Sequence, residues 1–218
     1  MMLHGKMIRH SATGLNKDRL IRFVAKPGVF LLGLTPLGWL AWQWAYAGLG
    51  ANPIEATIRF LGDWGLRFLL LSLTVTPLRE LFGWVVLVRF RRMMGLFAFF
   101  YGALHLSSYI GLDQFFDWAA IWADIRKRIY ITFGMTAFVL LAPLAATSTK
   151  GMIKRLGGPR WKRLHMLTYP ASMLAVTHYY LLVKADVREP LLYAGILALL
   201  LGYRVMQRLR KRMQRRTA

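Results

Sequence analysis

Six long apolar stretches constrain the fold of this chain more than any other feature of its sequence. They cover about residues 29–49, 64–82, 94–112, 129–147, 164–183 and 191–206. A helix of about 20 apolar residues crosses the hydrocarbon core of a bilayer, and only closed hydrogen-bonding patterns such as helices survive there. The connections are short and no fixed-period repeat is evident. The sequence therefore predicts an all-α membrane protein, a bundle of six transmembrane helices.

Charged residues at the ends of these stretches predict the orientation of the bundle. Most of the 30 Lys and Arg residues lie in the N-terminal tail, at 79–92, at 150–163 and from 204 onward. These segments share one side of the predicted bundle, while most of the nine acids lie on the other. The positive-inside rule then places both termini in the cytoplasm, an N-in/C-in topology. The aromatic loop at 113–128 is predicted to be an amphipathic helix at the opposite interface.

The formal net charge of +21 bears on possible partners. In a soluble protein such a charge suggests nucleic acid, but beside membrane helices it is an orientation signal that also attracts anionic lipids. We therefore expect the lipid bilayer as a partner and no nucleic acid. The sequence contains no Cys, which excludes disulfides, Cys-ligated clusters and covalent haem attachment. Histidine is left as the main ligand for a redox metal.

Three histidines lie within or at the edge of predicted spans, where an ionisable residue usually marks a functional site. His105 follows Arg92, and His178 follows Arg163, by nearly the same number of residues. At 1.5 Å per residue, both imidazoles would lie about 20 Å from the cytoplasmic edge. The third and fifth spans run in the same direction, so His105 and His178 are predicted at one depth. Two imidazoles at one level suit axial ligation of a b-type haem iron.

His165 lies close to the predicted cytoplasmic surface, and its role is open. It is a ligand of a second haem or an alternate ligand, a contact of a flavin or quinone, or an interfacial structural residue. Pro170 could kink the fifth span and turn both His165 and His178 toward the bundle centre. Basic residues on this side, including Arg92 and Arg160, could pair with haem propionates or a flavin phosphate, or could simply anchor the helices.

No catalytic motif is apparent in the sequence. It has no Rossmann fingerprint, catalytic triad or paired-carboxylate arrangement. Electrons are therefore expected from a membrane quinone or from a separate flavin reductase. Two alternatives remain open: a quinol-oxidising cytochrome b subunit of another oxidoreductase or a metal reductase, and a haem-free transporter with a histidine proton relay.

An ordered set of short motifs resembles the MsrQ (YedZ) family, haem-binding membrane subunits of the bacterial periplasmic methionine sulfoxide reductase system. The motifs are TPL at 76–78, RFRRMMGL at 89–96, LHLSSY at 104–109, TST at 147–149, RW at 160–161, LH at 164–165 and HY at 178–179. The resemblance covers about residues 33–203. NADPH oxidases and ferric reductases are similar in the haem core but carry two His on the third helix, whereas this chain has only His105 there.

The resemblance implies a ferric-reductase-like fold in the inner membrane that carries electrons and is not itself the catalytic subunit. One or two b haems would be held by His105 with His178, His165 or both, and FMN is also reported for the family. Other cofactor contacts are expected at Arg92, Arg160 and Trp161. The acceptor would be a periplasmic molybdopterin-containing catalytic subunit. The expected organisation is a basic cytoplasmic tail at 1–27, a six-helix haem-binding domain at 28–207 and a second basic tail at 208–218.

Overall fold

The computed structural model describes residues 18–215, and every regular element in this part of the chain is a helix. Parts of both predicted tails, residues 1–17 and 216–218, lie outside the described residues. The chain divides into two compact units between Leu49 and Gly50. The division into two tails and one six-helix domain stays a prediction.

The first unit contains one long helical segment, Asp18–Ala47. It consists of a π-helical turn η1 (Ile21–Ala25), α2 (Lys26–Trp42) and a second π-helical turn η2 (Gln43–Ala47). Pro36 lies inside α2 and has no N–H to offer the carbonyl four residues before it, Leu32. The Thr35 hydroxyl donates to that carbonyl at 2.7 Å. The helix therefore continues through the proline with this oxygen satisfied.

The second unit carries the remaining helices. They are α3 (Pro53–Phe82), η3 (Val85–Leu87), α4 (Val88–Ser108), η4 (Tyr109–Asp113), α5 (Trp118–Lys127), α6 (Ile129–Ala146), α7 (Lys150–Leu156), α8 (Gly158–His165), α9 (Thr168–Leu182) and α10 (Arg188–Gln214). Capping residues in the sequence explain where α3 begins and ends. Asn52 caps α3 through its side chain, which accepts from the Glu55 N–H at 3.2 Å, and Gly83 ends α3 with a φ of 69°.

A helix occupies the position of each predicted span. Among residues 18–215, four segments are long and apolar enough to cross a membrane: Asp18–Ala47, Val85–Asp113, Ile129–Ala146 and Arg188–Gln214. The helices at the other two predicted spans, α3 and α9, are not among these four, because α3 is too rich in charged residues and α9 is too short. Charged residues such as Arg67 and Arg79 interrupt the apolar run of α3, and α9 has 15 residues. The all-helical membrane fold is thus confirmed, whereas six complete crossings remain to be tested.

The fifth predicted stretch is not one helix. α8 ends at His165, a turn follows at residues 166–167, and α9 begins at Thr168. The bend considered at Pro170 lies one turn earlier, because Pro170 is in the first turn of α9 and has no N–H to offer the carbonyl of Met166, where the helix is interrupted. The direction of the chain therefore changes just after His165 and before His178.

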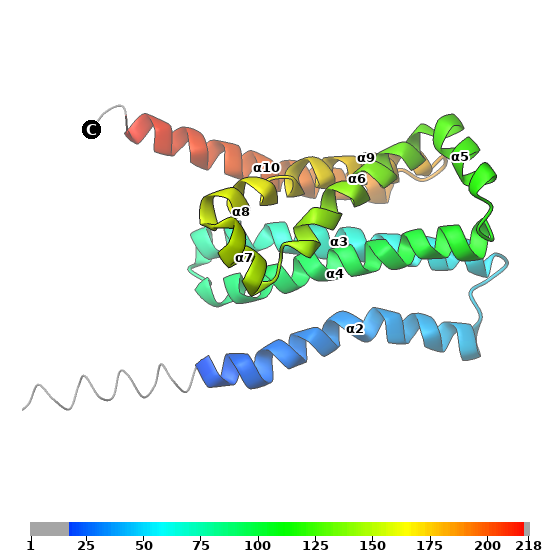
Figure 1. Cartoon of the computed structure of the whole chain (residues 1–218), viewed down its shortest axis with the longest axis horizontal. Coiled ribbons are helices and arrows are strands. Elements are labelled where there is room, and N and C mark those ends of the chain that lie inside the picture. Colours follow the sequence, from blue (N-terminus) through cyan, green and yellow to red (C-terminus); the bar gives the residue numbers. More distant parts are fainter. Residues whose placement is uncertain (1–17, 216–218) are drawn as a thin grey trace, which may run out of the picture. The chain divides into compact units, whose positions relative to one another are not determined.

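Within the second unit, α3 packs along α4 and α6 packs along α9. Gly65 allows a close approach of α3 to α4, since a Cβ there would lie 3.3 Å from the Gly102 nitrogen. Figure 1 shows α4 and α9 running in the same direction along this unit. A buried apolar cluster joins three of the helices. Its members are Leu66, Leu70 and Leu73 of α3, Val176 of α9, and Leu197 and Leu200 of α10.

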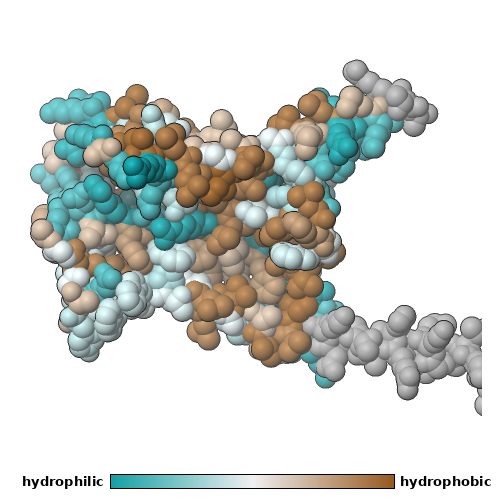
Figure 2. Space-filling view, turned by 180° about the vertical axis from the view of Figure 1, so that it is seen from behind, coloured by the Kyte–Doolittle hydropathy of each residue, from teal (hydrophilic) through white to brown (hydrophobic). Residues whose placement is uncertain are grey.

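Large apolar side chains cover much of the outer surface. Leu199 is 77% exposed and Val139 is 62% exposed, values that suit contact with lipid but not with water. Figure 2 shows hydrophobic residues over a broad part of one face and hydrophilic residues gathered toward its ends. This distribution agrees with a membrane protein whose helix ends meet water.

The predicted amphipathic segment at 113–128 contains α5. Asp117 caps α5, with its side chain accepting from the N–H groups of Ala119 and Ala120 at 3.0 Å. Trp118 and Trp122 are exposed on α5. Its position at the membrane interface stays a prediction.

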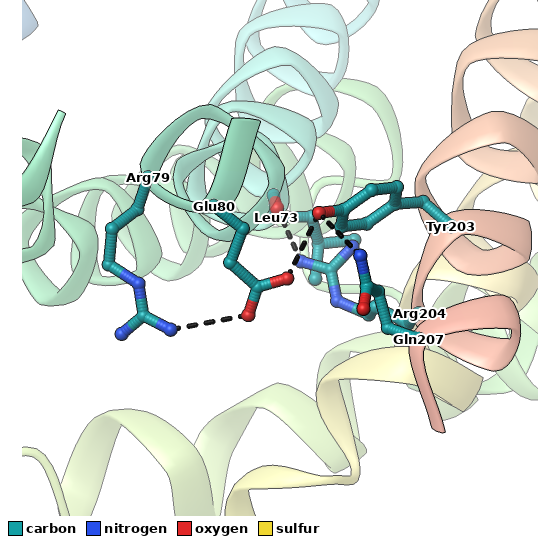
Figure 3. Close-up of polar contacts among 6 residues, drawn as sticks. All are labelled: Leu73, Arg79, Glu80, Tyr203, Arg204 and Gln207. Carbon is teal, nitrogen blue, oxygen red and sulfur yellow. Dashed lines mark hydrogen bonds and ion pairs between the residues drawn. The ribbon is translucent and has the colours of Figure 1, made fainter. Parts of the chain in front are cut away.

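Arg204 of α10 is buried and faces into the bundle. Figure 3 shows its guanidinium reaching the carbonyl of Leu73 on α3. It also donates to the Leu200 carbonyl at 2.7 Å. Beside it, the Tyr203 hydroxyl donates to the Glu80 carboxylate at 3.1 Å (Figure 3). These contacts hold α10 against α3.

Candidate functional site

His105 and His178 lie next to each other in the second unit. His105 is near the end of α4, and His178 is in the second half of α9. Their ring centres are 6.1 Å apart, and their ring planes are inclined by 77°. Both side chains are partly buried. Of the two possible partners of His105 considered from the sequence, the structure brings His178 to it and not His165.

Each of the two rings is held by a backbone carbonyl. His105 Nδ1 lies 2.8 Å from the Ile58 oxygen of α3, and His178 Nδ1 lies 2.7 Å from the Tyr130 oxygen of α6. A carbonyl oxygen can only accept, so Nδ1 carries the proton in each neutral ring. Nε2 is then unprotonated, and its lone pair is available to a metal. Metal-binding histidines commonly have such a partner on the other ring nitrogen.

The spacing of the two rings suits one metal ion between them. A metal–imidazole bond of about 2.0 Å on each side, with the rings facing each other through Nε2, separates the ring centres by about 6 Å. Among the described residues, no group of three or more His, Asp and Glu side chains could hold a metal. Two nitrogen donors do not complete a structural zinc site, which takes four protein ligands, but they complete a haem, whose porphyrin supplies the other four.

Aromatic and apolar side chains surround this part of the bundle. The Tyr130 ring centre is 6.1 Å from that of His178, and the Phe99 and Phe138 rings stack at 5.1 Å between α4 and α6. Tyr101 is fully buried and stacks on Phe68 at 5.4 Å. Tyr101 therefore acts as a packing residue between α3 and α4. Such walls exclude water from a bound porphyrin.

His165 belongs to a separate cluster at the end of α8. Its ring stacks on Trp161 at 3.8 Å, and its Nδ1 lies 3.1 Å from the Trp161 carbonyl. Trp161 Nε1 donates to the Thr147 carbonyl at 3.0 Å, which ties α8 to the end of α6. His165 precedes α9 while His178 lies in its second half, so about 15 Å or more of helix separates them along the axis.

The other predicted cofactor contacts are not gathered around the histidine pair. Arg92 is exposed near the start of α4, and Arg160 is exposed in α8. Trp161 is half-buried against His165. Figure 1 shows the start of α4, the helix of Arg92, at the same end of the second unit as α8, the helix of Arg160, Trp161 and His165. A ligand bound at this end would be distinct from one held between His105 and His178.

The carbonyls of Ile58 and Tyr130 are functional groups that the sequence did not predict. Every residue carries a carbonyl, so a backbone acceptor has no signature in the sequence. Two glycines, Gly62 and Gly134, were the available signal, since a glycine inside an apolar helix often marks a close approach. The sequence does not show which helices pack together, so it could not indicate that the rings of His105 and His178 approach these two glycines.

Comparisons with known proteins give the family. Residues 61–176 match the family model described as ferric reductase like transmembrane component. Three similar proteins each bear the name protein-methionine-sulfoxide reductase heme-binding subunit MsrQ. The one from Rhodospirillum rubrum is 60% identical, over 90% of this chain and 93% of its own length. The one from Caulobacter vibrioides is 54% identical, over 82% and 85%. The one from Xanthomonas campestris pv. campestris is 53% identical, over 86% and 88%.

The family model covers more than half of the chain. The matched region contains His105 and ends within α9, two residues before His178. The named relatives extend the similarity over most of the chain on both sides. This chain belongs to the MsrQ family, whose transmembrane part is of the ferric-reductase-like type.

Proposed function

We propose that this protein is the b-type haem electron-transfer subunit of a protein-methionine-sulfoxide reductase system. The observation that carries the proposal is the histidine pair, with ring centres 6.1 Å apart and both Nδ1 atoms held by carbonyls. The names of the relatives, which describe heme-binding subunits of this reductase, support the same assignment.

In this function the chain's own residues bind, orient and shield the cofactor. His105 and His178 would hold the haem iron through Nε2, and the Ile58 and Tyr130 carbonyls keep the proton of each neutral ring on Nδ1. The aromatic walls on α4 and α6 lower the local polarity and keep water away. A bound haem would supply one-electron redox chemistry. No residue of this chain is assigned a catalytic role toward the final substrate.

The proposed partners are those that the resemblance to the family and the absence of a nucleotide-binding motif in the sequence imply. The acceptor is a periplasmic molybdopterin-containing catalytic subunit, and the donor is a membrane quinone or a cytoplasmic flavin reductase. The cluster of His165, Trp161, Arg92 and Arg160 lies at the α8 end. It is the candidate for a second haem or for FMN, since a stacked aromatic pair and guanidinium groups suit a flat anionic cofactor.

The proposed topology has six crossings of the bacterial inner membrane with both termini in the cytoplasm. Fusions of an alkaline phosphatase reporter, which is active only outside the cytoplasm, test it directly. Fusions after residue 50, within 113–117 and at 185 are expected to be active, and fusions after residue 83, at 157 and at the C-terminus inactive. The α5 and α7–α8 segments would then lie on opposite sides. Activity at residue 157 would contradict the proposed orientation.

The first test of the function is an absorption spectrum of the detergent-purified protein, oxidised and reduced with dithionite, with haem and flavin counted per chain. A b-type spectrum that shifts on reduction is expected. The His165→Ala variant is measured beside it: loss of one haem of two would assign a second haem to His165, and unchanged haem with lost flavin would assign the flavin. A protein supplied with haem during expression that remained colourless would overturn the proposal and favour a transporter with a histidine relay.

Electron delivery is tested with the purified holoprotein and its candidate acceptors. Reduced protein is expected to be reoxidised by the periplasmic subunit together with a methionine sulfoxide substrate. Reoxidation by ferric chelates alone, with none by the periplasmic subunit, would instead make the chain a metal reductase.

A further inference from the structure

Each histidine of the pair is seated against a backbone carbonyl and a glycine of one neighbouring helix, an arrangement called a socket below. In α3, the carbonyl that receives His105 belongs to Ile58, and the residue four positions later is Gly62. In α6, the carbonyl that receives His178 belongs to Tyr130, and the residue four positions later is Gly134. Each socket is therefore a carbonyl at position i and a glycine at position i+4 of one helix.

The sockets also occupy equivalent places in the chain. His105 is 47 residues after its carbonyl partner, and His178 is 48 residues after its own. Each histidine lies on the helix that packs along its socket helix, α4 on α3 and α9 on α6. Figure 1 shows these two helix pairs side by side in the second unit. The histidine site is thus built from two helix pairs of like design, although the sequence shows no repeat.

Glycine is required in each socket by the position of the ring. A carbonyl in an α-helix points toward residue i+4, so a ring that reaches this carbonyl from outside lies over that residue. A Cβ on Gly134 would lie 2.8 Å from His178 Nδ1 and 3.0 Å from its Cε1. A Cβ on Gly62 would lie 3.0 Å from His105 Nδ1 and 3.2 Å from its Cε1. A side chain at Gly134 would force the His178 ring to shift, and a side chain at Gly62 would press the His105 ring away from its seated position to a smaller extent.

We infer that Gly62 and Gly134 are positioning residues that set the planes of the two axial imidazoles, and thereby the electronic state of the haem iron held between them. The inference rests on the proposed function. With both rings seated, their planes are inclined by 77°. Near-perpendicular axial imidazoles give ferric low-spin haem a strongly anisotropic electron paramagnetic resonance signal, distinct from that of parallel rings. Hydrogen bonding to the axial ligand also tunes the reduction potential.

The test compares Gly134→Ala and Gly62→Ala with Gly195→Ala. The control is matched, because Gly195 lies within α10 and an added Cβ there meets nothing within 4 Å. All three changes have the same effect on intrinsic helix propensity. The measurements are the resonance spectrum of the ferric holoprotein, its reduction potential, and the rate of haem transfer to excess apomyoglobin.

The expected result is graded. Gly134→Ala, with the shorter contact, should change the resonance spectrum and potential most and speed haem transfer about 10- to 100-fold. Gly62→Ala should show a smaller change of the same kind, and Gly195→Ala should match the wild type. If Gly134→Ala does not accumulate as a folded protein, Gly62→Ala carries the test alone. Wild-type spectra and transfer rates in the variants that retain haem would overturn the inference while leaving the proposed function intact. A wild-type protein without haem would overturn both.

Discussion

Replacing His105 or His178 with alanine is expected to reduce haem affinity by more than about 100-fold, because loss of a hydrogen-bonding partner of a ligand already costs about 10- to 100-fold. Each change removes one of the two side-chain nitrogens that the site offers. The two sockets are equivalent, so the two variants should lose haem to a similar extent. The measurement is haem per chain in detergent-purified protein, determined from the pyridine haemochrome spectrum.

Two controls make this result specific. Met173→Ala changes an exposed residue of α9, the helix that carries His178, and should keep its haem. Added imidazole should enter the space left in His105→Ala or His178→Ala and restore a six-coordinate spectrum in whatever haem remains. Full haem occupancy and an unchanged spectrum in either alanine variant would show that the pair is not the ligand set.

Replacing Arg204 with methionine is expected to lower the free energy of unfolding by about 2–3 kcal/mol, the usual value of a buried hydrogen bond from a charged donor. The reason lies in α3. Pro77 has no N–H, so the carbonyl of Leu73, four residues earlier, lacks its normal helical donor. Leu73 is fully buried, and the Arg204 guanidinium supplies the missing donor (Figure 3). Methionine keeps the length of the side chain but leaves this oxygen without that donor.

A double-mutant cycle tests that explanation. Pro77→Ala restores an N–H to α3, so Arg204→Met should cost about 1 kcal/mol less in the Pro77→Ala background than in the wild type. The measurement is the unfolding midpoint in detergent with added SDS. Equal costs in both backgrounds would show that Arg204 stabilises the protein by another route, such as its contact with the Tyr169 ring at 5.8 Å.

The sequence placed His105 and His178 at one depth by counting residues from Arg92 and from Arg163. The first count follows one helix, α4, but the second crosses the turn at residues 166–167 before it reaches His178 through α9. The two residues still meet, because α4 and α9 run in the same direction and each carries its histidine in its second half (Figure 1). His165 could not be placed in the same way, because the chain turns at residues 166–167, and no residue there has a strong helix-breaking character. Pro170, the residue with such character, lies in the first turn of α9, so it indicated an interruption of this stretch but not that the chain turns four residues earlier.

The sequence by itself determined the class of this protein. Apolar runs of bilayer length, a basic excess and the lack of Cys leave a helical membrane protein with histidine as its metal-binding side chain. Only the tertiary structure decided which histidines meet and what holds them, because these depend on which helices pack together. The carbonyls of Ile58 and Tyr130 accept from the two histidines only because α4 packs against α3 and α9 packs against α6. For the same reason, the absence of a side chain at Gly62 and Gly134 leaves room for an imidazole ring. The carbonyl that Pro77 leaves without a donor is likewise visible in the sequence, but its partner Arg204 comes from a helix more than a hundred residues away.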